Sequence, residues 1–356
     1  SLHDALPILG LSTVAIGLLP SYEQIGVWAP ILLCVFRIGQ GIGLGGEWGG
    51  AALVATENAP EGRRGWFGTF PQLGAPIGLF LANGGFFLVS YFLGAETMVA
   101  WGWRIPFLLS FVMVLVGLYV RLNLHESHVF EQAEKAGRKL HAPVAAVLRQ
   151  HGRAILLGTL IMTTTYVLFY LMTAFVQVYS KSPVGVSPAG HPTGLGIPAN
   201  IFTGILLIGA IVFGIFTSLS GVLADTLGRR LWLILVTLGI MGFGLAMPAL
   251  LTHGTPMTVL VFIIIGLSLM GCTFGPMAAL LPEMFPTEVR YSGASLAYNF
   301  ASIVGASIPT LVALDLNKNF GLWGVGLYLA ANGLLTLGAL LATRETRLLD
   351  LTLVKA

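Results

Sequence analysis

The chain has 356 residues, of which 56% are hydrophobic and only 9% are charged. An ordinary soluble domain has about 25% charged residues, so this composition excludes a soluble protein and indicates a chain that crosses a membrane many times. The formal net charge of +3 does not indicate a nucleic-acid partner, because the basic residues lie in short segments between apolar runs. We expect a lipid bilayer around the protein instead.

Apolar runs separated by helix breakers predict an all-α integral membrane fold with ten transmembrane helices. The ten runs cover residues 8–19, 27–56, 65–92, 104–122, 153–179, 198–224, 231–251, 257–282, 291–314 and 322–342. The first run has about 12 residues, whereas about 20 are needed to cross a bilayer. We therefore interpret the chain as beginning partway through a helix.

Lysine and arginine residues separate the loops into two sets, and positive residues are retained on the cytoplasmic side. The basic loops, together with the basic C-terminal tail, contain Arg63, Arg64, Arg121, Lys135, Arg138, Lys139, Arg149, Arg153, Arg229, Arg230, Arg290, Arg344, Arg347 and Lys355. The alternate loops hold only Lys181 and Lys318, with Arg104 at a helix entrance. This distribution predicts that both ends of the chain are cytoplasmic.

The longest basic loop, residues 121–153, is polar and rich in charge, which is typical of a solvated connector between bundles. It divides the chain into a bundle of four predicted helices at 1–122, a cytoplasmic linker at 123–152, and a bundle of six helices with a short tail at 153–356. We predict these three parts as the domain organisation.

The sequence gives no indication of a metal or cofactor. Cys34 and Cys272 lie in apolar runs without metal-ligand spacing, so packing is the simpler interpretation. Gly41, Gly43 and Gly46 form a GxGxxG pattern, but no strand precedes them, which excludes a dinucleotide site. Close helix packing explains these glycines.

An internal repeat relates the two halves. A shift of 226 residues places the stretch 37–60 on 263–286 without a gap, and the matched pairs include Gly45 with Gly271, Gly49 with Gly275, Glu57 with Glu283 and Pro60 with Pro286. Parallel repeats of this kind are expected of two bundles related by an axis along the membrane normal. The two charges inside the predicted helix 27–56 do not recur, because Arg37 falls on Ile263 and Glu47 on Thr273.

Arg37 and Glu47 are therefore the residues to explain, because charges at membrane depth are costly and commonly mark transport paths. Arg37 lies ~15 Å into its helix, and its guanidinium suits a carboxylate. The alternative is an arginine paired permanently inside the protein. Gln40, one turn on, shares its face. Glu47 is a candidate proton carrier, because burial favours the neutral carboxyl group, or else a structural acceptor between glycine-packed helices.

Several motifs resemble those of the major facilitator superfamily. GVLADTLGRR at 221–230 matches its G-x-L-A-D-x-x-G-R-R loop, and Arg37, Gln40 and Gly41 match its R-x-x-Q-G motif. GGEWGGA at 45–51, FPQLGAP at 70–76, WGWRIPF at 101–107 and PEMFPTEVRYSG at 282–293 together look like its metabolite:proton symporter branch. The resemblance implies two pseudo-symmetric bundles in the bacterial inner membrane, of which this chain holds the third to twelfth of twelve helices.

The resemblance also implies a set of gating residues on the cytoplasmic side. In the family, acids and arginines at helix ends form latches with the G-x-L-A-D-x-x-G-R-R loop. The positions that match are Gly221, Asp225, Gly228, Arg229, Arg230, Glu283, Arg290, Glu57 and Arg63. We expect these residues to contribute to gating and not to substrate contact.

Further polar residues in predicted helices are candidates for the substrate path, or else for hydrogen-bonding seams between helices. They are Gln72, Asn83, Tyr166, Tyr170 and Asn299. The favoured interpretation is a monomeric symporter that carries a small organic acid or zwitterion with protons by alternating access. A passive uniporter and a transporter-like sensor are the alternatives. An intramembrane enzyme is disfavoured, because the sequence contains no HExxH or GxSxG motif.

Overall fold

The structure is a computed structural model that describes residues 2–123 and 144–347. Helices make up nearly all of this described part, and its β-type pairing is limited to one isolated bridge between Val186 and Pro192. The all-α prediction is therefore confirmed. Most of the predicted linker, residues 124–143, lies outside the described residues.

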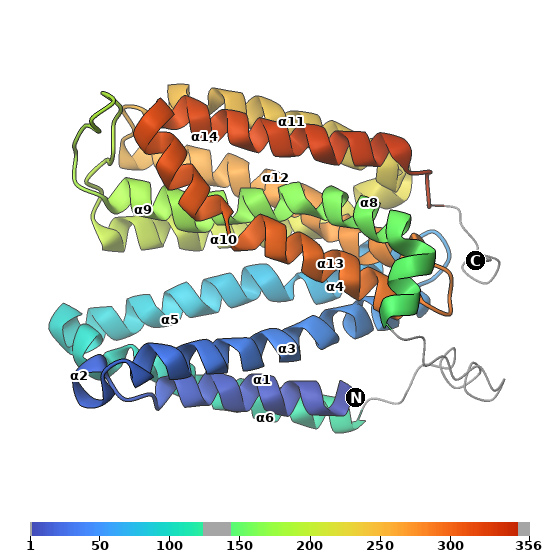
Figure 1. The fold of residues 1–356 in the computed structure, drawn as a ribbon, viewed down its shortest axis with the longest axis horizontal. Helices are drawn as coiled ribbons and strands as arrows, with labels where there is room; N and C mark the ends of the chain where they lie inside the picture. The colour runs from blue at the N-terminus through green and yellow to red at the C-terminus, as the bar shows by residue number, and fades with distance from the viewer. Residues whose placement is uncertain (1, 124–143, 348–356) are drawn as a thin grey trace. The chain divides into compact units, whose positions relative to one another are not determined.

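Contacts divide the chain into two compact units, and the first comprises Ser1–Ala51 and Leu81–Lys139. Its helices are α1 (Leu2–Gly17), α2 (Tyr22–Ile25), most of α3 (Trp28–Glu57), the second part of α5 (Gly74–Thr97), the π-helical turn η1 (Met98–Gly102) and α6 (Arg104–Asn123). Helix α1 packs along α6 (Figure 1). Arg104 supports this pair, because its Nη2 donates to the carbonyl of Leu19, which follows α1, at 2.9 Å.

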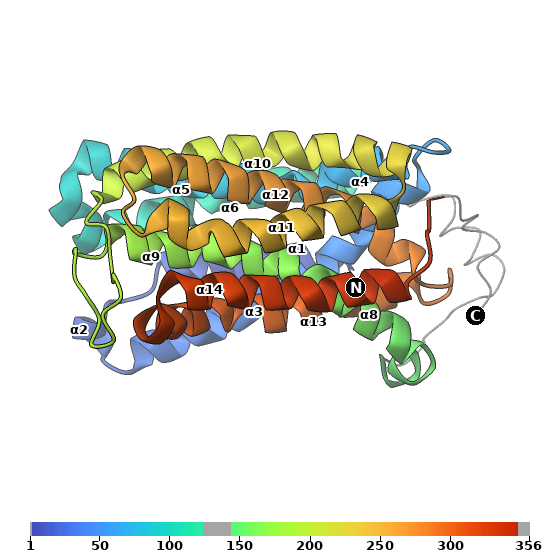
Figure 2. The same ribbon diagram turned by 90° about the horizontal axis from the view of Figure 1, so that it is seen from above.

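The second unit comprises Ala52–Phe80 and Leu140–Ala356. It holds the end of α3, α4 (Arg64–Gln72), the start of α5, α8 (Val144–Tyr170), η2 (Leu171–Phe175), α9 (Val176–Lys181), α10 (Ala199–Leu227), α11 (Arg229–Leu251), α12 (Pro256–Glu283), α13 (Arg290–Ala306) and α14 (Pro309–Ala342). Helix α10 packs along α12, α11 along α14 and α8 along α13 (Figures 1 and 2). Helix α4, from the first predicted bundle, packs against α10 and α12 in this unit.

Each predicted apolar run is helical, but several helices have different bounds. Helix α8 begins at Val144 and changes direction at His151, where φ is −122° and ψ is 20°. Helix α14 contains Gly321 at φ +68°, a conformation that a residue with a Cβ rarely adopts. Gly321 therefore divides α14 just before the predicted segment 322–342, whereas the predicted segment 291–314 is itself divided between α13 and α14.

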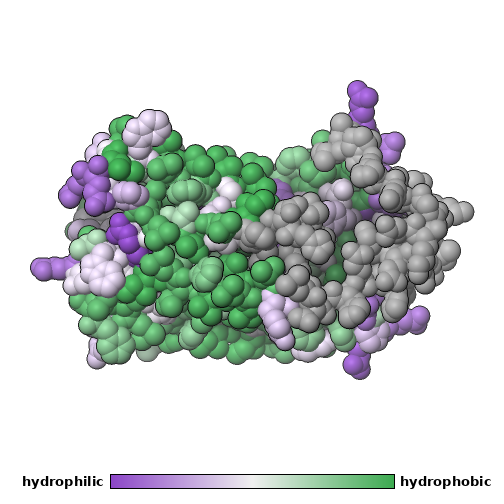
Figure 3. All heavy atoms as spheres, turned by 90° about the horizontal axis from the view of Figure 1, so that it is seen from below, coloured by the Kyte–Doolittle hydropathy of each residue, from purple (hydrophilic) through white to green (hydrophobic). Residues whose placement is uncertain are grey.

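Eight helices of the described part are long and apolar enough to cross a membrane. The last of these, Arg290–Ala342, runs for 53 residues through α13 and α14. On the face drawn in Figure 3, hydrophobic residues form a broad band, and hydrophilic residues gather toward its two ends. A band of this kind matches the apolar interior of a bilayer with polar boundaries on both sides.

Candidate functional site

A buried cluster of charges joins the ends of α10, α11 and α12 in the second unit. Arg229, the first residue of α11, is 1% exposed. Its Nη1 lies 2.9 Å from Oδ1 of Asp225, and its Nε lies 3.3 Å from Oε2 of Glu283. One arginine thus neutralises two buried carboxylates, which makes their burial tolerable. The structure thus brings together Asp225, Arg229 and Glu283, three of the residues that we expected to contribute to gating.

Asp225 also holds the N-terminus of α4. Its two carboxylate oxygens accept hydrogen bonds from the backbone N–H groups of Gly65 and Trp66, both at 2.8 Å. These N–H groups have no partner within the helix, and the helix dipole favours an anion at this end. Asp225 therefore links the α10–α11 turn to α4 through both charge and hydrogen bonds.

Gly221 explains how α4 comes so close. A Cβ at Gly221 would overlap the methyl group of Thr69 and lie 2.7 Å from the carbonyl oxygen of Gly65. Only glycine leaves room for this contact between α10 and α4. The first glycine of the GVLADTLGRR motif is thus required for close approach of the two helices.

We expect Gly221→Val to separate α4 from α10, because the valine side chain would occupy the position of the Gly65 carbonyl. The loss of the Asp225 cap should lower thermal stability in detergent and expose the start of α4 to hydrogen–deuterium exchange. Gly242 is a matched control, since no atom lies within 4 Å of a Cβ placed there. Unchanged exchange at residues 64–69 in Gly221→Val would contradict this account.

A second ion pair joins the end of α3 to the start of α13. Nη1 of Arg290, the first residue of α13, lies 3.6 Å from Oε1 of Glu57 at the end of α3. Arg64 is equivalent to Arg290 in the 226-residue repeat, and it acts electrostatically on Glu283, the equivalent of Glu57. The predicted gating residue Arg63 is exposed and begins α4 as its N-cap residue. The 226-residue repeat, which places Arg64 on Arg290, would have predicted Arg64 in place of Arg63 as a gating residue.

The turn between α10 and α11 is held by further contacts, some of them from three residues that the sequence did not indicate. The Arg230 guanidinium donates to the carbonyls of Leu340 and Leu341, each at 3.0 Å, and Gly228 occupies φ +97° in the α10–α11 turn. Glu345, Thr346 and Arg347 follow α14 and contact the same turn. The only sequence signal for these residues was that the segment after α14 carries charges.

Arg37 lies in α3, within the first unit, and its guanidinium is exposed. Its Nη1 donates to Oε1 of Gln40 at 3.3 Å, and Nε2 of Gln40 donates to the hydroxyl of Thr13 in α1 at 2.7 Å. Within the described residues, no carboxylate lies within ion-pair distance of Arg37. The structure thus holds the guanidinium through Gln40 and leaves its remaining donors available to an anion. Glu47 is half-buried on the same helix.

Of the other polar candidates, four lie in the second unit, and Asn83 lies in the first. Gln72 is buried, and its Nε2 donates to the carbonyl of Phe274 at 2.7 Å, which fits a seam between α4 and α12. Asn299 bonds locally to the Ser295 carbonyl at 2.7 Å. Tyr166 and Tyr298 meet edge to face with ring centroids 5.5 Å apart, whereas Tyr170 contacts Phe169. Tyr298 was not predicted. Asn83 is half-buried in α5.

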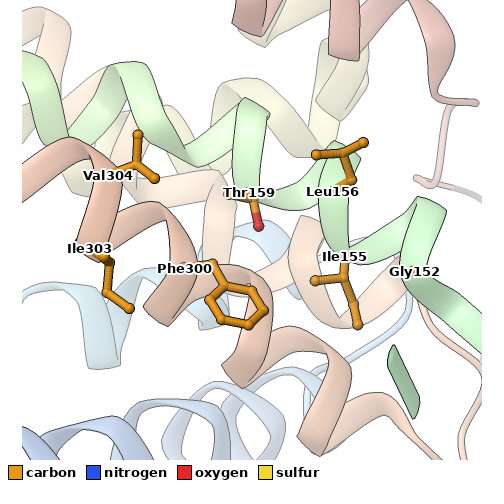
Figure 4. A pocket seen from close by; sticks show the side chains of 7 residues that line it. All are labelled: Gly152, Ile155, Leu156, Thr159, Phe300, Ile303 and Val304. Atoms are coloured by element: carbon orange, nitrogen blue, oxygen red, sulfur yellow. The ribbon is translucent and has the colours of Figure 1, made fainter. Parts of the chain in front are cut away.

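A groove of about 350 Å³ lies between α8 and α13 (Figure 4). Its lining is apolar except for Thr159, whose hydroxyl donates to the Ala297 carbonyl at 3.4 Å. The side chains that line it are Ile155, Leu156, Thr159, Phe300, Ile303 and Val304, beside Gly152. Because this lining offers no charge to a carboxylate, the groove does not fit the predicted substrate.

The chain is similar to one protein family and to several transport proteins. The family model described as Major Facilitator Superfamily matches residues 6–310. A Haemophilus influenzae relative is 66% identical over 352 residues, covering 99% of this chain and 80% of its own length. The inner membrane metabolite transport protein YhjE of Escherichia coli is 53% identical and covers 98% of this chain and 78% of its own. The Escherichia coli shikimate transporter is 34% identical, with 96% and 76% covered.

Solved structures show the same fold. The proton:xylose symporter XylE, bound to 6-bromo-6-deoxy-D-glucose, superimposes with a TM-score of 0.73 over 97% of this chain and 80% of its own. The sequence identity between the two is 20%, so this similarity concerns the fold. The arrangement of helices in the chain is thus one that solved membrane proteins adopt.

Proposed function

Because the chain belongs to the major facilitator superfamily, we propose that it carries a small organic acid or zwitterionic metabolite across the inner membrane together with protons. The family and the relatives are transporters, so the chain is a multi-pass membrane transporter and not an enzyme. The substrate class, the proton coupling and the roles of individual residues are the proposal.

The availability of Arg37 is the observation that carries the proposal. An arginine inside an apolar helix is costly, and a permanent carboxylate partner would explain it without any function. In the described residues, Gln40 orients the guanidinium and no carboxylate neutralises it. A fork of donors that is oriented and not neutralised suits a substrate carboxylate, which can accept two parallel hydrogen bonds.

The names of the relatives support the same class of substrate. One is a shikimate transporter, and others are proline/betaine transporters that are 31% to 32% identical to this chain. Shikimate, proline and betaine each carry a carboxylate. A carboxylate is therefore the chemical group shared by these substrates, and it is the group that Arg37 fits.

We propose that the charged cluster of Asp225, Arg229 and Glu283 is the cytoplasmic latch of the transport cycle. It joins α10, α11 and α12 to α4, which comes from the first predicted bundle. Alternating access requires such contacts to break when the cytoplasmic side opens. The topology that goes with this proposal has ten crossings and both chain ends in the cytoplasm, with α13 and α14 contributing two crossings.

Transport assays in proteoliposomes test the proposal. We expect accumulation of labelled shikimate, proline or glycine betaine against its gradient when the outside is acidic, and loss of accumulation when the pH gradient is collapsed. Flux that only equilibrates the substrate would indicate a uniporter, and binding without flux would indicate a sensor. If accumulation requires protons, Glu47→Gln should retain substrate exchange but lose the response to the pH gradient.

A further inference from the structure

The segment that follows α14 is folded against the charged cluster. Residues 343–347, here named the C-terminal strap, leave α14 at its end (Figure 1). The two carboxylate oxygens of Glu345 accept hydrogen bonds from the backbone N–H groups of Arg229 and Arg230, each at 3.0 Å. These are the first N–H groups of α11, where an anion is favoured by the helix dipole. Glu345 thus holds α11 as Asp225 holds α4.

Gly228 makes room for this contact. A Cβ at Gly228 would lie 2.7 Å from Oε2 of Glu345, and its φ of +97° excludes most other residues. Arg230 strengthens the same attachment from the other side, because it donates to the last carbonyls of α14. The N-terminus of α11 is therefore matched by the Glu345 carboxylate of the strap, and the C-terminus of α14 by the Arg230 guanidinium of α11.

Thr346 extends the attachment to the charged cluster itself. Its hydroxyl donates to Oε2 of Glu283 at 2.6 Å, and the residue is 5% exposed. Nη1 of Arg347 donates to the carbonyl of Thr226 at 2.6 Å. A continuous path of bonds therefore runs from Thr346 through Glu283, Arg229 and Asp225 to the N-terminus of α4.

We propose that the C-terminal strap positions the latch, with Glu345 and Thr346 as its positioning residues. Thr346 orients the Glu283 carboxylate toward Arg229, and Glu345 fixes the turn that carries Arg229. When either contact is lost, Arg229 no longer holds Asp225 against α4, and the equilibrium shifts toward an open cytoplasmic side. This role rests on the proposed function of the latch, but it concerns a segment that the family motif does not include.

Distances between spin labels at positions 61 and 227 report directly on the contact between α4 and α10. Both residues are exposed, and the background would carry Cys34→Ser and Cys272→Ala. We expect Glu345→Gln and Thr346→Val to increase the population with the longer distance about tenfold, because each weakens hydrogen bonds to a charged group. Thr346→Ser should restore the parent distribution, since it retains the hydroxyl.

Thr343→Val is the matched control within the same segment. The Thr343 hydroxyl donates to the Leu340 carbonyl at 2.8 Å and does not touch the charged cluster. A parent-like distance distribution in both Glu345→Gln and Thr346→Val would overturn the inference, as would an equal change in Thr343→Val. The measurement does not need transport, so absent uptake by the parent chain would count against the proposed function while these distances still test the strap.

Discussion

Replacement of Arg37 by alanine is expected to abolish most uptake at low substrate concentration. The guanidinium is the positive group oriented inside α3, and a hydrogen bond to a charged group contributes about 1.5–3 kcal/mol. The loss of such a bond should reduce uptake about 10- to 100-fold below saturation and raise KM. Uptake by Arg37→Lys should lie between that of the parent chain and that of Arg37→Ala, because lysine retains the charge but lacks the planar fork. Initial rates in proteoliposomes across substrate concentrations measure this.

Cys34→Ala provides the control for Arg37. Cys34 is exposed on the same helix, three residues earlier, and is a free cysteine. It should leave KM unchanged. If Arg37→Ala transports substrate with the KM of the parent chain, Arg37 does not bind the carboxylate, and the observation that supports the substrate class is lost. Gln40→Ala should show a smaller increase in KM, because Gln40 only orients the guanidinium.

Replacement of Arg229 by methionine is expected to destabilise the second unit strongly. Arg229 is 1% exposed and lies within 3.3 Å of carboxylate oxygens of both Asp225 and Glu283. Removal of one partner from a buried ion pair typically costs about 3–5 kcal/mol, because the remaining charge is left without compensation. Thermal unfolding in detergent should show a lower Tm, and the spin-label distances between positions 61 and 227 should shift toward the open state.

A double variant distinguishes charge from packing in this cluster. Arg229→Met combined with Glu283→Gln removes one of the stranded carboxylates and should recover part of the lost stability. Arg153→Ala, at an exposed arginine of α8, should leave Tm unchanged. A parent-like Tm in Arg229→Met would mean that the two carboxylates are held by other groups, and the latch would need a different explanation.

Several features of the fold and of the charged cluster were predictable from the sequence. The composition, the apolar runs and the GVLADTLGRR motif predicted an all-α membrane protein and a charged cluster at Asp225, Arg229 and Glu283, and the structure contains both. The motif fixes an aspartate and an arginine four residues apart, so the pairing of Asp225 with Arg229 was predictable. The 226-residue repeat also predicted equivalent helix ends at Glu57 and Glu283, although its arginine is Arg64 and not Arg63.

Other features depended on contacts between distant segments. Glu345 and Thr346 lie more than fifty residues from their partners, and no periodicity links a tail carboxylate to backbone N–H groups of α11. The requirement for glycine at Gly221 and Gly228 likewise becomes clear only when Thr69, Gly65 and Glu345 are seen beside them. Gln72, predicted as a path residue, bonds to a backbone carbonyl in α12, and this contact fits packing.

The sequence by itself determined that this protein is helical, crosses a membrane and carries an arginine within an apolar segment, because hydrophobicity is a local property of each segment. Only the tertiary structure decided which helix ends these charges hold and that, within the described residues, no carboxylate lies within ion-pair distance of Arg37. Ion pairs and helix caps depend on distances of a few ångströms between segments that are far apart in the chain. Arg229 is therefore buried between two carboxylates, whereas Arg37 is exposed and oriented by Gln40.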